Sequence, residues 1–116
     1  FGADGRLEAA FGAAGGATII AQVAKAIIAH VDWGMSVEDA LAAPQIMADR
    51  RGIRFEAGST LEAKASTLKA LGHASVEPAT LPLKGNAVAR DGAGWRGAAD
   101  PRSEGAAVAV DRRGRQ

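Results

Sequence analysis

Apolar side chains recur at spacings of three and four between residues 17 and 32, and this spacing predicts a helix. The members of the main stripe are Ile20, Val23, Ile27 and Val31. Ile19 and Ile28 widen the stripe, so we expect the helix to be covered on more than one side. The polar residues that interrupt its surface are Gln22, Lys25 and His30. Gly34 ends the pattern.

Two shorter helices are predicted from capping signals at their first residues. Residues 36–39 (SVED) have the spacing of a capping box, with Asp in place of the preferred Glu, and Pro44 closes the helix that they start. Residues 59–62 (STLE) form a second capping box. The helix after it ends at Gly72, a residue type that suits the position just beyond a helix.

Short alternating patterns predict strands near the N-terminus and through the second half of the chain. The predicted strands are residues 6–12, 53–56, 74–76, 86–90, 95–98 and 106–110. Residues 91–94 (DGAG) predict a hairpin turn, and residues 111–116 predict either a further turn or a frayed end. No repeat and no low-complexity linker divides the sequence. We therefore expect one α+β domain over residues 1–116, without an internal boundary, with helices early and strands late.

Composition excludes several classes of protein. The 14 basic and 13 acidic side chains leave a formal charge of +1, which attracts neither nucleic acid nor an anionic membrane. The longest apolar stretch, residues 17–31, is too short and too polar for the roughly 18 apolar residues of a membrane helix. The chain has no cysteine, which excludes disulfides and thiolate sites. With 28 Ala, 15 Gly and few aromatic residues, the core must bring its elements close together.

A glycine pair, Gly15 and Gly16, lies between the first predicted strand and the most apolar helix. Glycine lets a ligand approach the backbone, and free N–H groups at a helix start favour an anion. The missing Gly-Lys-Ser/Thr excludes a P-loop. Three interpretations remain from the residues alone: a dinucleotide site, which the glycine spacing fits poorly; an oxyanion hole of two successive N–H groups; and a tight turn without a ligand.

The sharpest short motif is Asp100-Pro101-Arg102. An Asp before Pro is restricted to extended or turn geometry, which fixes a loop. Asp and Arg can pair through two hydrogen bonds or anchor a neighbouring helix end. We expect this motif to be structural rather than catalytic.

The remaining polar residues have ordinary interpretations. His30 and His73 have no partners at metal-ligand spacing, so we expect core or capping roles and no metal or cofactor. Thr18 has no adjacent base and is expected to be a helix-start hydroxyl rather than a nucleophile. The charge clusters at 49–52 and 112–115 are expected to be solvated turns.

Six short motifs follow one another in a characteristic order. They are GGATII (15–20), VDWGMSVEDA (31–40), AP (43–44), FEAG (55–58), LGH (71–73) and GAADPR (97–102). Each is weak alone. In this order, and at this spacing, they resemble the gamma-glutamyltranspeptidase family, in particular the C-terminal part of its small subunit.

The resemblance implies an N-terminal-nucleophile hydrolase fold, which is a stacked αββα sandwich. In this family the precursor cuts itself, and the freed N-terminal Thr of the small subunit attacks a gamma-glutamyl amide, with its own amino group as the base. A gamma-glutamyl ester then passes to water or to an acceptor amine. By the same resemblance, Gly15 and Gly16 supply the backbone donors for the oxyanion.

The sequence departs from the family at several points. The nucleophilic Thr and the residues that hold the substrate's amino and carboxylate groups lie outside this chain. Ala14 stands where the family usually has Pro, and Gln45 stands where it usually has Arg, so a charge role at position 45 is in doubt. We expect the 116 residues alone to be catalytically silent and to act as scaffold and oxyanion donor. The partners would be the rest of the small subunit, the large subunit and a gamma-glutamyl substrate.

Two rival functions stay open, a related acylase of the beta-lactam type and a non-catalytic structural or interaction module. Since the chain begins at Phe1 without a Met or a signal pattern, we interpret it as a trimmed or excised piece. Any export signal would lie upstream of Phe1, which leaves the periplasm and the cytoplasm equally open. Because a fragment exposes surface that is normally covered, we expect the isolated chain to self-associate.

Overall fold

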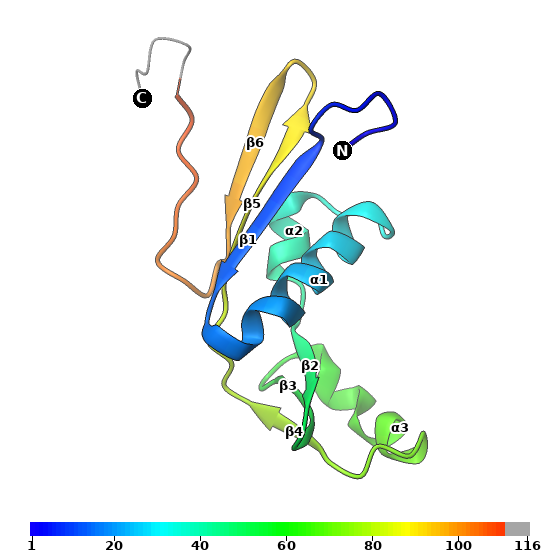
Figure 1. The fold of residues 1–116 in the computed structure, drawn as a ribbon. Helices are drawn as coiled ribbons and strands as arrows, with labels where there is room; N and C mark the ends of the chain where they lie inside the picture. The colour runs from blue at the N-terminus through cyan, green and yellow to red at the C-terminus, as the bar shows by residue number, and fades with distance from the viewer. Residues whose placement is uncertain (111–116) are drawn as a thin grey trace. The chain divides into compact units, whose positions relative to one another are not determined.

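The computed structural model describes residues 1–110, which divide into two compact units (Figure 1). Within the described residues, unit 1 contains residues 1–43 and 83–110, and unit 2 contains residues 44–82. We expected no internal boundary because the sequence has no linker. The two units are joined without a linker, and unit 2 begins at Pro44 and ends at Pro82. The assignment of residues 1–116 to a single domain stays a prediction.

Unit 1 has one antiparallel sheet in the order β1-β5-β6, formed by β1 (Ala9–Ala14), β5 (Lys84–Asp91) and β6 (Gly94–Ala99). The predicted hairpin is confirmed, because Asp91 pairs with Gly94 and Gly92 adopts a φ of 57° between them. Figure 1 shows α1 (Ile19–Val31) and α2 (Val37–Ala42) on the same side of this sheet. A single 3-10 turn, η1 (Gly16–Thr18), joins β1 to α1.

Small residues build the core between the helices and the sheet. The buried cluster of unit 1 contains Ala26, Val37, Leu41, Ala87, Ala89 and Ala98. At Gly85 the approach is closest, since a Cβ added there would lie 2.8 Å from Leu41 Cδ2. A side chain at position 85 would therefore displace the Leu41 side chain, which is buried in this core, so the packing favours glycine here.

The start of α2 follows the predicted capping box. The Ser36 hydroxyl accepts a hydrogen bond from the Asp39 N–H at 3.0 Å and donates to Asp39 Oδ2 at 2.9 Å. These bonds satisfy a helix-end donor that would otherwise have no intrahelical partner. The helix ends at Ala42, two residues before Pro44, as predicted.

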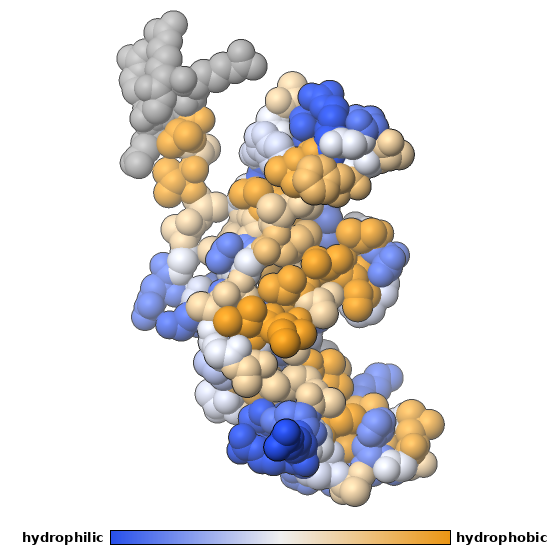
Figure 2. Space-filling view, viewed as in Figure 1, coloured by the Kyte–Doolittle hydropathy of each residue, from blue (hydrophilic) through white to orange (hydrophobic). Residues whose placement is uncertain are grey.

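The outer face of α1 is exposed in the described chain, where we expected cover on more than one side. Ile20 is 82% exposed, Val31 67% and Trp33, just after the helix, 62%. Figure 2 shows hydrophobic residues gathered over α1. Nothing within residues 1–110 covers this face, so part of the apolar stripe of α1 is not buried by the described chain.

Unit 2 has a second sheet in the order β2-β3-β4, formed by β2 (Ile46–Asp49), β3 (Gly52–Glu56) and β4 (Val76–Ala79). β2 was not predicted. β3 and β4 pair in parallel, and the connection between them contains η2 (Thr60–Lys64) and α3 (Ala65–Ala70). The buried core of this unit is Ile53, Phe55 and Val76. Ser59 caps the first turn by accepting from the Leu61 N–H at 3.3 Å, so the second capping signal starts a 3-10 helix that continues into α3.

Three strand predictions need correction. The strand predicted at residues 74–76 is β4, which covers residues 76–79. The first strand covers residues 9–14 rather than 6–12. Residues 106–110 form no strand, because no described strand pairs with them, and Val108 and Val110 are about 60% exposed. The segment lies close to β6, since a Cβ added at Gly97 would lie 3.1 Å from Ala107 Cβ. The prediction for 111–116 lies outside the described residues.

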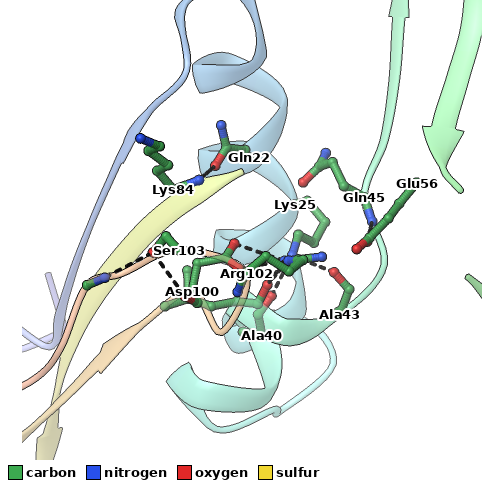
Figure 3. Close-up of polar contacts among 12 residues, drawn as sticks. Gln22, Lys25, Ala40, Ala43, Gln45, Glu56, Lys84, Asp100, Arg102 and Ser103 are labelled. Atoms are coloured by element: carbon green, nitrogen blue, oxygen red, sulfur yellow. Dashed lines mark hydrogen bonds and ion pairs between the residues drawn. The ribbon is translucent and has the colours of Figure 1, made fainter. Parts of the chain in front are cut away.

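The Asp100-Pro101-Arg102 motif follows β6 and lies against the C-terminal end of α2 (Figure 3). Arg102 donates to both carboxylate oxygens of Asp100, from Nε at 2.7 Å and from Nη2 at 2.9 Å, and Nη2 also donates to Leu41 O. Lys25 Nζ donates to the carbonyls of Ala40, Leu41 and Ala43 at 2.8–2.9 Å. Two cations therefore satisfy the free carbonyls that end α2.

Asp100 is buried, with 3% of its surface exposed. Burial raises the pKa of this carboxyl, but hydrogen bonds from the side chain and backbone N–H of Arg102 outweigh burial and hold the pKa below its ordinary value. The ionised carboxylate thus stabilises the fold above the pKa of the unfolded chain, and this contribution is lost as the pH falls through the native pKa.

We predict that Arg102→Leu lowers the free energy of unfolding by about 3 kcal/mol at neutral pH, because it leaves Asp100 buried without its partner. The deficit should shrink as the pH falls, because without the hydrogen bonds of Arg102 the buried Asp100 carboxyl of the variant takes up a proton at a higher pH than that of the original protein. Denaturant unfolding of the intact protein at several pH values measures both effects.

Arg96→Leu is the matched control, because Arg96 and Asp91 form an Arg–Asp pair on the same sheet with both side chains more than half exposed. This variant should change the free energy of unfolding much less than Arg102→Leu does, because water screens the exposed ion pairs of Arg96 with Asp91 and Glu38. Equal losses in the two variants would contradict the anchoring role of Asp100 and Arg102.

Candidate functional site

The glycine pair adopts backbone conformations that other residues rarely take. After β1 ends at Ala14, Gly15 has a φ of 126° and Gly16 a φ of 63°. A Cβ at Gly16 would meet no atom within 4 Å, so the dihedral angle, and not crowding, requires glycine there. Two successive positive φ angles turn the chain from β1 into η1 and α1.

The N–H groups of Gly15 and Gly16 donate to no described residue. The adjoining carbonyls are occupied: Gly15 O accepts from the Thr18 N–H at 3.4 Å, and Gly16 O accepts from the Ile19 N–H. Gly15 is half-buried and Gly16 is exposed. The turn therefore presents two neighbouring free donors at the head of α1, an arrangement that can bind one negatively charged oxygen.

Thr18 is buried at the start of α1, and its hydroxyl faces the glycine pair. Its Oγ1 donates to Gly15 O at 3.0 Å and accepts from Gln22 Nε2 at 2.8 Å. This places Thr18 in the helix-start position that the sequence predicted. A hydroxyl held in this way on the backbone side of the turn is a structural group.

Gln22 is the residue of this region that the sequence analysis missed. Its Nε2 also donates to Ala14 O at 2.9 Å. Its Oε1 accepts from the Lys84 N–H at 2.9 Å (Figure 3). One buried amide thus connects the end of β1, the start of α1 and the start of β5. The available signal was a polar residue on an apolar stripe, four positions after Thr18, but the contact with Lys84 spans 62 residues and has no local sign.

The structure brings the two predicted motifs to one end of the sheet. Gly85 lies opposite Ala13 in the ladder, two residues before the glycine pair, and Gly85 O accepts from the Asp100 N–H at 2.8 Å. The anchored loop and the glycine turn are therefore positioned by the same strand ends of unit 1.

A wide hollow lies elsewhere in unit 1, over the open face of the sheet beside residues 106–110. It has a volume of about 1110 Å³ and is lined largely by small residues such as Ala10, Gly12 and Gly97. This lining has few groups suited to acid–base or nucleophilic chemistry. The volume of this hollow is therefore not a reason to make it the candidate site.

Gln45 is fully buried in unit 2, at the position where the resemblance leads one to expect Arg. Its backbone N–H donates to Glu56 Oε2 at 3.2 Å, and its Nε2 donates to Ile46 O at 2.7 Å. Its Oε1 has no hydrogen-bond partner among residues 1–110. The side chain therefore contributes a neutral hydrogen bond to the backbone of its own unit and no charge.

The histidines have capping or surface positions. His30 Nδ1 lies 2.7 Å from Met35 O, just after α1, and its ring packs on Phe11 with centroids 5.7 Å apart. His73 is exposed. Among the described residues no group of three or more His, Cys, Asp or Glu side chains could hold a metal ion. No helix of this part of the chain is long and apolar enough to cross a membrane.

Solved structures share this fold, although no curated protein matches the sequence. The chain is similar to gamma-glutamyltranspeptidase from Pseudomonas nitroreducens complexed with L-DON, with 25% identity and a TM-score of 0.82 over 96% of this chain. It also matches the T380A mutant of the Helicobacter pylori gamma-glutamyltranspeptidase, with 23% identity and a TM-score of 0.76 over 89% of this chain. The transpeptidase CapD of Bacillus anthracis has 18% identity and a TM-score of 0.72 over 87% of the chain.

The chain spans about 60% of the Pseudomonas chain, 58% of the Helicobacter chain and 63% of CapD. The predicted fold class, an α+β chain that is part of an N-terminal-nucleophile hydrolase αββα sandwich, is confirmed. The sequence model described as Gamma-glutamyltranspeptidase matches residues 1–110. The chain therefore belongs to the gamma-glutamyltranspeptidase family.

Proposed function

We propose that the chain is the C-terminal segment of the small subunit of an enzyme that transfers or hydrolyses gamma-glutamyl groups of glutathione-type amides. In this proposal Gly15 and Gly16 donate their N–H groups to the oxyanion, and the rest of the segment is scaffold. The observation that carries it is the pair of adjacent, unpartnered N–H groups at the head of α1. Membership of the family supports the choice of substrate.

The reaction requires a nucleophile that these 116 residues do not supply. By the family resemblance it is the N-terminal Thr of the small subunit, whose hydroxyl attacks the amide carbon while its amino group takes the proton. A C–O bond forms, and the carbonyl oxygen gains a negative charge, which the N–H groups of Gly15 and Gly16 stabilise. The intermediate then expels the amine, which receives the proton, and leaves a gamma-glutamyl ester. Water or an acceptor amine attacks this ester through a second intermediate of the same kind.

The described chain supports a scaffold role. The Thr18 hydroxyl is buried and donates to Gly15 O, so it is not directed at a substrate. The hydrogen bonds of Gln22 and the ion pair of Asp100 hold the strand ends around the glycine turn. The partners in this proposal are the rest of the small subunit and the large subunit, which would cover apolar surface such as the outer face of α1.

We predict that the full-length protein hydrolyses a chromogenic gamma-glutamyl anilide and accumulates a gamma-glutamyl ester on its N-terminal Thr. The 116-residue chain alone should give no turnover, because it has no nucleophile. Mass spectrometry of the acid-quenched enzyme detects the ester as a mass increase on the small subunit. Cleavage of acyl amides without an α-amino acid group, and not of gamma-glutamyl amides, would favour the acylase alternative instead.

We predict that Gly16→Ala lowers kcat about tenfold, because Ala resists the φ of 63° and turns the peptide that carries the donor. Gly92→Ala is the matched control, since Gly92 has a φ of 57° and equally open space around its Cα, but lies in the hairpin between β5 and β6. That control should keep kcat within about twofold while imposing a similar strain. Equal kinetics in the two variants would argue against an oxyanion role for Gly16.

We predict that the isolated chain self-associates through its exposed apolar surface. Sedimentation velocity should show dimers or larger species, and replacing Ile20 and Val31 on the outer face of α1 with Lys should shift the protein toward monomer. Lys replacements at the polar, exposed positions Thr67 and Ser66 of α3 serve as the control and should leave the distribution unchanged. A clean monomer of the unmodified chain at high concentration would contradict this prediction.

A further inference from the structure

We propose that Gln22, acting together with Thr18, is the positioning residue that sets the direction of the Gly15 and Gly16 N–H groups. The inference rests on the proposed function, in which these N–H groups receive the oxyanion. Neither side chain touches the substrate in this proposal. Both act on the opposite edge of the peptides that carry the donors.

The argument begins with the geometry of the peptide bond. Each peptide is planar and trans, so its C=O and its N–H point in opposite directions. The N–H of Gly15 belongs to the same peptide as Ala14 O, and the N–H of Gly16 belongs to the same peptide as Gly15 O. Any group that holds these two carbonyl oxygens on one side therefore fixes both N–H groups on the other side.

The two carbonyls in question are held by a single buried amide. Gln22 Nε2 donates directly to Ala14 O at 2.9 Å. The same nitrogen donates to Thr18 Oγ1 at 2.8 Å, and that hydroxyl donates to Gly15 O at 3.0 Å. Gln22 thus holds the carbonyl side of both donor peptides. It holds Ala14 O directly and Gly15 O through the Thr18 hydroxyl.

The orientation of the Gln22 amide follows from its neighbours. The Lys84 N–H on β5 can only donate, so the amide oxygen must face it, and Ala14 O can only accept, so the amide nitrogen must face that side. Gln22 is 5% exposed, and water cannot easily replace these bonds. Because Lys84 pairs with Ala14 in the ladder, the sheet itself locates the amide relative to the turn.

The hydrogen bonds from Gln22 and Thr18 to Ala14 O and Gly15 O also strengthen the Gly15 and Gly16 N–H groups as donors. A carbonyl that accepts a hydrogen bond polarises its peptide and makes the N–H of that peptide a better donor. Gly15 and Gly16 need this external support because glycine has no side chain to restrict its own dihedral angles. Positive φ values permit the turn, and the side chains of Thr18 and Gln22 hold it.

The test uses the full-length enzyme with Thr18→Val, Thr18→Ser and Gln22→Met, and with Thr67→Val as a control on the exposed face of α3. We expect kcat to fall about a hundredfold in Gln22→Met. In Thr18→Val the fall should be only about tenfold, because the backbone N–H at position 18 still donates to Gly15 O. KM should stay nearly constant, because oxyanion donors act mainly in the transition state. Thr18→Ser, which keeps the hydroxyl, should restore kcat to near the original value, and Thr67→Val should not change it.

Crystal structures of the same variants give a readout that does not depend on turnover. In Thr18→Val and Gln22→Met, the Gly15–Gly16 peptide should rotate, and in Gln22→Met the Ala14–Gly15 peptide should rotate as well. Peptides that keep their direction in Gln22→Met, together with an unchanged kcat, would overturn the positioning role and leave the proposed function intact. Rotated peptides with unchanged turnover would support the positioning role and instead refute the oxyanion function of the glycines. If the unmodified enzyme lacks gamma-glutamyl activity, the peptide directions alone decide the inference.

Discussion

Close contact between α1, α2 and the sheet of unit 1 is the constraint on which the rest of the structure depends. It is possible only because glycine and alanine face the helices, with Gly85 beneath Leu41 and alanines along β5 and β6. At this separation there is little room for water between the layers. Polar groups that are buried at the ends of the strands and helices therefore need partners within the protein.

Three long side chains provide those partners at one end of the sheet. Lys25 and Arg102 satisfy the last carbonyls of α2 (Figure 3). Gln22 satisfies backbone groups of β1 and β5. Each reaches backbone atoms of a segment far along the chain from its own. The result is a rigid frame around a turn whose two glycines have no such means of stabilising themselves.

Local signals in the sequence were enough for much of unit 1. The spacing of isoleucines and valines predicted α1, the Ser36 capping box predicted the start of α2, and DGAG predicted the hairpin between β5 and β6. The features that failed depend on distant partners. β2 becomes a strand because β3 lies beside it, and residues 106–110 have the composition of a strand but no described neighbour to pair with.

The candidate site shows the same division. Gly15 and Gly16 stood out because their place between a strand and a helix is visible in the sequence. Gln22 could be read only as a polar interruption, because its role depends on Lys84, which the fold alone brings near. Sequence patterns thus identify the proposed oxyanion donors more readily than the side chains that contact the backbone behind them.

Unit 2 lies between β1 and β5 in the sequence, and this order has a consequence for synthesis on the ribosome. Phe11 pairs with Ala87, so 76 residues separate strands that lie side by side in the finished sheet. At typical elongation rates of roughly 5–20 residues per second, β5 is synthesised several seconds after β1. During that interval the apolar face of α1 and the unpaired edge of β1 are both accessible, while the whole of unit 2 is already available to fold. The nascent chain therefore depends most on protection from aggregation before β5 emerges.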